Sequence, residues 1–92
     1  MIELGGSIKL DGFNSIDIPS LIVVKKIVGN YAKKLSEKNP EYKELLLQMS
    51  SESPNYELSA VLTTESKVFT SKASNNNLFF ALNQALDKIL KE

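Results

Sequence analysis

The sequence contains no cysteine, histidine, tryptophan or arginine. Without cysteine and histidine, thiolate catalysis, imidazole acid/base chemistry and the common zinc sites are excluded. Only carboxylates, lysines, tyrosines and hydroxyl groups remain as candidate functional groups, and no disulfide can stabilise the fold. We therefore expect no bound metal and no cofactor.

Long apolar segments are also missing. The apolar run from Leu21 to Val24 is interrupted by Lys25 and Lys26, and no stretch approaches the roughly 20 apolar residues that a membrane span requires. The first residues carry neither the positive charge nor the apolar core of a secretion signal. These features predict a cytoplasmic protein that has no membrane partner.

The 92 residues suit one domain, and 42% hydrophobic with 24% charged residues is an ordinary globular composition. Eleven basic residues, all of them lysine, balance eleven acidic residues, so the formal net charge is zero. The protein as a whole therefore does not attract polyanions, and any nucleic-acid contact must come from a local surface. We expect a single α+β domain over residues 1–92.

Hydrophobic periodicity predicts the elements of this domain. Apolar and polar residues alternate over 2–10, 42–50, 56–63 and 67–73, which indicates four strands; Gly5 and Gly6 interrupt the first and suggest a bulge. Three- and four-residue spacings indicate a helix from about residue 18, capped by Asp17 or Ser20, to about residue 39. A second helix follows the polar residues 74–77. The order β-α-β-β-β-α predicts a four-stranded sheet with both helices packed on one face.

The exposed face of the first predicted helix is rich in lysine. Lys26 and Lys33 lie on this face, and Lys25 and Lys34 lie on its flanks. Two interpretations remain open at this point, a solvated surface and a phosphate-binding surface. Gly29, in the middle of the helix, costs about 1 kcal/mol relative to alanine, so either a neighbour packs closely there or the helix tolerates it.

Enzymatic activity finds little support in the sequence. The carboxylate pairs Glu41 with Glu44 and Glu52 with Glu57 have no apolar setting that would raise a pKa toward neutrality. No phosphate-cradling loop is present, and no small-molecule substrate is indicated. Lysine offers a point charge without the forked geometry by which arginine reads guanine, so an RNA contact would go to the backbone and to shape. We predict a binding protein that is not an enzyme.

Several strings of the sequence resemble the ribosome hibernation-promoting factor family, also called the ribosome-associated inhibitor family. The segment Leu78–Asn83 (LFFALN), followed by Asp87–Ile89 (DKI), resembles the family's Met-Tyr-Ala-Ala-Ile-Asp and its later Asp-Lys-Leu. Ala60–Leu62 and Val68–Ser71 resemble its last two strands, and Lys34–Leu35 its Lys-Leu pair. Tyr31 stands where the family often has lysine, and Phe80 where it has a small residue.

The resemblance implies a domain related in shape to double-stranded-RNA-binding domains, which binds the small ribosomal subunit in the channel used by messenger and transfer RNA and so inhibits translation. We therefore expect the small ribosomal subunit or another structured RNA as the partner. The matched basic positions are Lys34 and Lys88. The helical projection adds Lys26, Lys33 and Lys91 as candidate RNA-binding residues, because they share exposed faces with the matched positions.

A second hypothesis is a protein-interaction module. It would use Ile22, Val23 and Phe80, which lie outside the main apolar stripes, or a sheet edge, to form a homodimer or to contact another protein. A related possibility is a small non-catalytic subunit of a transfer-RNA modification complex. The final helix of such a subunit carries a string like Ala81–Asn83 (ALN).

Overall fold

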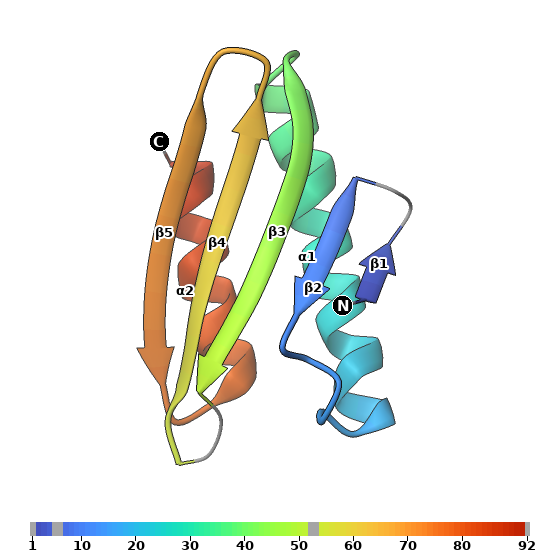
Figure 1. Ribbon diagram of the computed structural model, residues 1–92, viewed down its shortest axis with the longest axis vertical. Helices are drawn as coiled ribbons and strands as arrows, with labels where there is room; N and C mark the ends of the chain where they lie inside the picture. The colour runs from blue at the N-terminus through green and yellow to red at the C-terminus, as the bar shows by residue number, and fades with distance from the viewer. Residues whose placement is uncertain (1, 5–6, 52–53, 92) are drawn as a thin grey trace.

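The computed structural model describes residues 2–4, 7–51 and 54–91, which form two helices and a five-stranded sheet (Figure 1). The elements follow in this order: β1 (Ile2–Leu4), β2 (Ile8–Asp11), α1 (Ile18–Lys38), β3 (Tyr42–Ser51), β4 (Tyr56–Thr64), β5 (Val68–Asn75) and α2 (Leu78–Leu90). The predicted α+β class and both predicted helices are confirmed.

The strands lie in the order β1-β2-β3-β4-β5. All neighbours are antiparallel except β2 and β3, which are parallel and are connected through α1. The prediction of four strands is wrong, because residues 2–10 form the two strands β1 and β2. Ile2 pairs with Leu10 and Leu4 pairs with Ile8. A hairpin in this register places its apolar residues on one face. A single alternating strand would also place them on one face, so the alternation does not distinguish one strand from two. The bulge expected at Gly5 and Gly6 lies outside the described residues.

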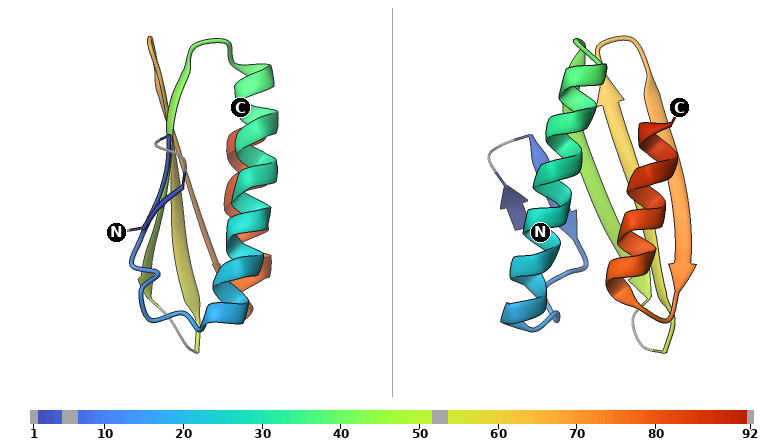
Figure 2. Two further views of the ribbon diagram at one scale, coloured as in Figure 1. Left: turned by 90° about the vertical axis from the view of Figure 1, so that its right-hand side faces the viewer. Right: turned by 180° about the vertical axis from the view of Figure 1, so that it is seen from behind.

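Both helices cover the same face of the sheet, so the molecule has two layers (Figure 2). The two helices run in the same direction along the sheet; α1 ends next to the start of β3, and α2 ends beside β5 (Figures 1 and 2). The core lies between the layers. It contains four residues of α1, six of α2 and the inward residues of the strands: Val24, Val28, Ala32, Leu35, Leu78, Ala81, Leu82, Ala85, Leu86, Ile89, Leu10, Leu45, Leu47, Met49, Leu58, Ala60 and Leu62.

Polar caps determine where the helices begin. The carboxylate of Asp17 accepts a hydrogen bond of 3.2 Å from the backbone N–H of Ser20, and Pro19 lies in the first turn of α1. The side chain of Asn77 accepts a hydrogen bond of 3.1 Å from the N–H of Phe80 at the start of α2. α1 ends at Lys38, directly before Asn39 and Pro40, as the sequence predicts.

Two glycines have different roles. Gly12 has a φ of 82°, and a Cβ atom there would lie 2.4 Å from the carbonyl oxygen of Met49. A side chain at this position would therefore be strained and would collide with β3. At Gly29, a Cβ atom would meet no other part of the protein within 4 Å beyond the adjacent turns of its own helix. The helix tolerates Gly29 without a close neighbour.

Within the described residues, neither helix is long and apolar enough to cross a membrane.

Candidate nucleic-acid interface

The outward face of α1 carries two lysines with free ammonium groups, which together form the lysine row of α1. Lys26 and Lys33 are exposed and lie seven residues apart, so they project from the same side of the helix, about 10 Å apart along its axis. Neither side chain makes a hydrogen bond or an ion pair with the described part of the chain. Both are therefore available to an external anion.

Lys34 lies on the side of α1 that faces α2. Its ammonium nitrogen is 5.2 Å from the centre of the Tyr31 ring, within the range of a cation–π contact. The hydroxyl of Tyr31 donates a hydrogen bond of 2.6 Å to Oδ1 of Asp87 on α2. Lys34 is exposed, so its charge remains accessible to solvent.

The contact with Asp87 changes the acidity of Tyr31. Burial raises the pKa of the Tyr31 hydroxyl to about 12, with further contributions from its hydrogen bond to Asp87 and from the charge of that carboxylate. All three causes favour the protonated phenol. Tyr31 is thus a hydrogen-bond donor at neutral pH that joins the two helices, and it has no acid/base role there.

The far ends of the helices are joined by a lysine that the sequence pattern does not single out. The ammonium group of Lys38, in the last turn of α1, donates a hydrogen bond to the carbonyl oxygen of Leu90 at the end of α2. A cation at a helix C-terminus is favourable because the terminal carbonyl groups carry partial negative charge. Lys91 follows Leu90 directly and is exposed. Lys38 and Lys91 therefore add positive charge where both helices end.

Lys88 lies on a different side of α2. Its ammonium group donates a hydrogen bond of 2.6 Å to the carbonyl oxygen of Lys72 in the edge strand β5. The structure therefore does not bring Lys88 together with the lysines of α1. Its contact blocks an edge carbonyl that an added strand could otherwise use.

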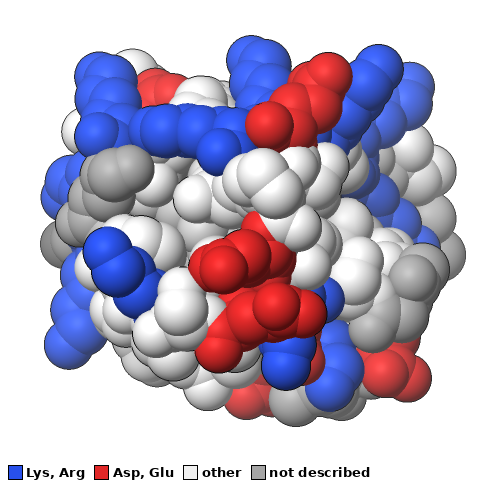
Figure 3. All heavy atoms as spheres, turned by 90° about the horizontal axis from the view of Figure 1, so that it is seen from above, with Lys and Arg blue, Asp and Glu red and all other residues white. Residues whose placement is uncertain are grey.

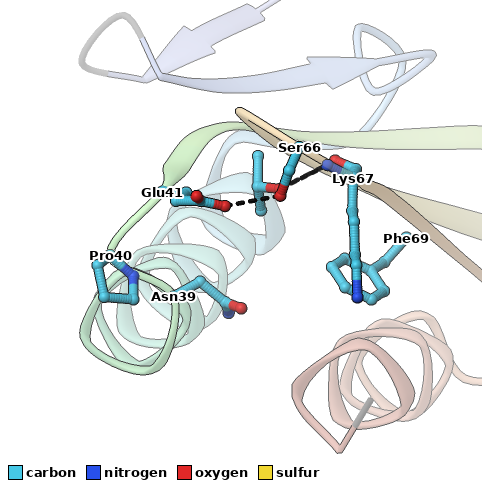
Figure 4. A pocket seen from close by; sticks show the side chains of 7 residues that line it. Asn39, Pro40, Glu41, Ser66, Lys67 and Phe69 are labelled. Carbon is cyan, nitrogen blue, oxygen red and sulfur yellow. Dashed lines mark hydrogen bonds between the residues drawn. The ribbon is translucent and has the colours of Figure 1, made fainter.

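Acidic residues interrupt the basic surface at the end of the molecule where α1 ends and β3 begins. In the view onto this end, a cluster of acidic side chains lies near the middle, and the rim carries mostly lysines with a few more acidic side chains between them (Figure 3). A hollow of about 470 Å³ lies here between the α1–β3 connection and the β4–β5 turn (Figure 4). Within it, Oε2 of Glu41 accepts a hydrogen bond of 2.7 Å from the hydroxyl of Ser66. The hollow is lined by charges of both signs, the carboxylate of Glu41 and the ammonium group of Lys67, so it is not a uniformly basic surface.

The apolar residues of the second hypothesis are exposed but belong to two helices. Ile22 and Val23 are 50% and 41% exposed on α1, and Phe80 is 57% exposed on α2. Ile22 and Val23 are consecutive, so they point about 100° apart around the helix. Ile18, at 75%, is more exposed than any of the three and was not predicted as a contact residue. Ile18 lies one helical turn before Ile22, so the four-residue spacing in the sequence would have identified the two as one exposed apolar pair.

The arrangement places exposed positive charge on α1. Among residues 2–4, 7–51 and 54–91, no cluster of three or more acidic side chains could hold a metal ion. The free lysines of α1 can contact successive phosphates of a nucleic-acid backbone, and such contacts carry no sequence information.

No protein-family model matches this chain, and no curated protein matches it in sequence. Solved structures with the same fold do exist. A ribosomal subunit interface protein from Coxiella burnetii aligns with a TM-score of 0.64 at 14% identity, covering 92% of this chain and 90% of that one. The N-terminal domain of Protein Y from Thermus thermophilus aligns with a TM-score of 0.62 at 13% identity, covering 91% and 89%. This likeness shows that the fold is shared across nearly the whole length of each chain.

Proposed function

We propose that this protein is a non-catalytic RNA-binding domain that associates with the small ribosomal subunit and inhibits translation by occupying an RNA channel. One observation carries the proposal: the chain shares its complete fold with a protein described as a ribosomal subunit interface protein. The lysines on the outer side of α1 supply chemistry that fits such a partner.

The proposed contact surface consists of Lys26, Lys33 and Lys34 on α1, extended by Lys91 at the end of α2. These ammonium groups would bind phosphates of ribosomal RNA as point charges. Lys38 is not included, because its ammonium group binds the carbonyl oxygen of Leu90. Lys88 contributes less, because its ammonium group is already engaged with the carbonyl oxygen of Lys72. The protein would act by steric occlusion and would break or form no covalent bond.

Co-sedimentation with purified small ribosomal subunits at increasing salt concentration tests this proposal. Phosphate contacts release counterions, so the binding constant must fall steeply as salt rises. Binding at low salt that disappears at high salt is the expected result. Absence of binding even at low salt, or binding that does not respond to salt, would contradict an interaction through phosphates.

A homodimeric or other protein-interaction module is the second candidate function. The exposed pair Ile18 and Ile22, one helical turn apart on α1, favours it because together they form an apolar surface on the helix. Analytical ultracentrifugation tests the homodimer directly. A sedimentation coefficient that rises with protein concentration, or that stays at the value of a dimer, would support self-association, and one that stays at the value of a monomer would exclude it.

A further inference from the structure

A hollow of about 550 Å³ lies on the outer side of α2, apart from the lysine row of α1. Its six lining residues all come from α2 and its cap: Asn77, Phe79, Phe80, Asn83, Gln84 and Asp87. Phe80 is the most exposed aromatic residue of the described chain, with 57% of its surface accessible. The other exposed residues that line the hollow, Asn77 and Gln84, are polar amides.

The polar groups around Phe80 retain unused hydrogen-bonding capacity. Oδ1 of Asn77 accepts from the N–H of Phe80, which leaves its amide NH₂ group as a donor. Nδ2 of Asn83 donates a hydrogen bond of 2.9 Å to the carbonyl oxygen of Phe79, which leaves the side-chain oxygen of Asn83 as an acceptor. The amide of Gln84 makes no hydrogen bond with the described part of the chain. The hollow thus presents both donors and acceptors close to an exposed aromatic ring.

We propose that this hollow is a binding site for one unpaired nucleobase, which stacks on the ring of Phe80 and is held at its edge by the amides of Asn77, Asn83 and Gln84. Proteins hold unpaired bases in this manner, with an aromatic face for stacking and polar side chains for the edge of the base. Asparagine and glutamine can both donate to and accept from adenine. This inference rests on the proposed function, because it identifies the RNA contacted as single-stranded at this point.

The surroundings of the hollow fit a nucleotide strand. Lys91 lies eleven residues after Phe80 on the same outward side of α2, about 16 Å along the helix axis. Lys34 contacts the ring of Tyr31, whose hydroxyl binds Asp87 at the rim of the hollow. Both lysines lie toward the C-terminal end of α2 from Phe80, so the strand that leaves the bound base in that direction could reach a lysine with its phosphates. A protein anchor typically lies in an apolar, well-packed cluster, whereas the other residues that line this hollow are three amides, the carboxylate of Asp87 and one apolar residue, Phe79.

The test uses two labelled RNA hexamers at low salt, one of six adenosines and one of six abasic riboses with the same phosphates. Fluorescence anisotropy gives the dissociation constants for the wild-type chain, Phe80→Leu and Phe80→Tyr. Leucine keeps an apolar side chain at this exposed position but removes the aromatic face on which a base can stack. Tyrosine keeps that aromatic face. Urea unfolding of each variant verifies that the fold is retained.

The wild-type chain should bind the adenosine hexamer about ten-fold more tightly than the abasic one. Phe80→Leu should remove this difference and Phe80→Tyr should preserve it. Equal binding of both hexamers by the wild-type chain would overturn the proposal. So would an unchanged preference in Phe80→Leu, or Phe80-dependent self-association without Phe80-dependent RNA binding, which would make Phe80 a protein contact.

The outcomes for this site and for the proposed function are separable. If Phe80→Leu does not alter hexamer binding while the wild-type chain still binds small subunits in a salt-sensitive way, only the nucleobase site is wrong. If the adenosine preference depends on Phe80 but no small-subunit binding occurs, the nucleobase site stands and the ribosomal partner is wrong.

Discussion

The hydroxyl of Tyr31 on α1 donates a hydrogen bond of 2.6 Å to Oδ1 of Asp87 on α2, 56 residues further along the chain. This bond joins the two helices on the side away from the sheet, between the lysine row of α1 and the Phe80 hollow of α2. It therefore helps to fix the relative position of the two proposed contact surfaces.

Removing this hydroxyl should weaken the fold. We expect Tyr31→Phe to lower the free energy of unfolding by about 1–2 kcal/mol, because a half-buried hydrogen bond to a carboxylate is lost. Urea denaturation measures the change. Tyr56→Phe is the matched control, since Tyr56 is also half-buried but its hydroxyl makes no hydrogen bond with the described residues. Equal stability of the two variants would show that the Tyr31–Asp87 bond contributes nothing.

The raised pKa of Tyr31 should be visible when the protein is titrated with base. Burial, the hydrogen bond and the charge of Asp87 raise the pKa of Tyr31 to about 12. In the unfolded chain the pKa of the Tyr31 hydroxyl is near 10, so the folded state keeps this proton up to a higher pH than the unfolded state does. Its stabilising contribution is complete below pH 10 and is lost as the pH rises toward 12. An absorbance titration of tyrosinate should show a component near pH 12 that is missing in Tyr31→Phe. Persistence of that component in the variant would assign it to another tyrosine.

The two glycines should respond in opposite directions to alanine. We expect Gly12→Ala to destabilise the protein by about 2 kcal/mol or more, since its φ of 82° disfavours a side chain and the new Cβ would collide with Met49. Gly29→Ala should stabilise it by about 1 kcal/mol, because alanine favours the helix and has open space there. Thermal unfolding of both variants measures the changes. A loss of stability in Gly29→Ala would mean that the glycine has a neighbour.

Lys38 should have a structural role that the exposed lysines of α1 lack. Lys38→Ala removes the bond to the carbonyl of Leu90, and we expect a loss of about 1 kcal/mol together with faster amide exchange in the last turn of α2. Lys33→Ala is the control and should change stability by less than about 0.5 kcal/mol, because Lys33 is exposed and makes no bond within the described chain. Similar exchange rates in both variants would argue against the Lys38 contact.

Much of the fold could be predicted from local patterns. The buried residues of α2 repeat with helical spacing, and Asp17 and Asn77 lie where caps are expected, so both helices follow from the sequence. The hairpin of β1 and β2 could not be recognised, because Ile2, Leu4, Ile8 and Leu10 alternate in the same way in one strand as in two.

The candidate interface was predictable only in part. The exposure of Lys26 and Lys33 follows from the helical projection of α1 alone. The engagement of Lys88 with the Lys72 carbonyl and of Lys38 with the Leu90 carbonyl depends on how α2 packs against β5 and α1. Contacts between segments so distant in the chain leave no periodic signal in the sequence.

Charge reversal on α1 tests the central claim most directly. The variant Lys26→Glu, Lys33→Glu, Lys34→Glu is compared with Lys43→Glu, Lys67→Glu, Lys72→Glu, which makes the same change of charge at exposed positions of the sheet and its turn. Both variants are titrated against small ribosomal subunits over a salt series. The account predicts that the α1 variant loses most of its affinity and that its salt dependence becomes shallower by about two to three units of slope, while the control retains binding. Equal effects in both variants, or no effect in either, would contradict the assignment of the RNA contact to α1.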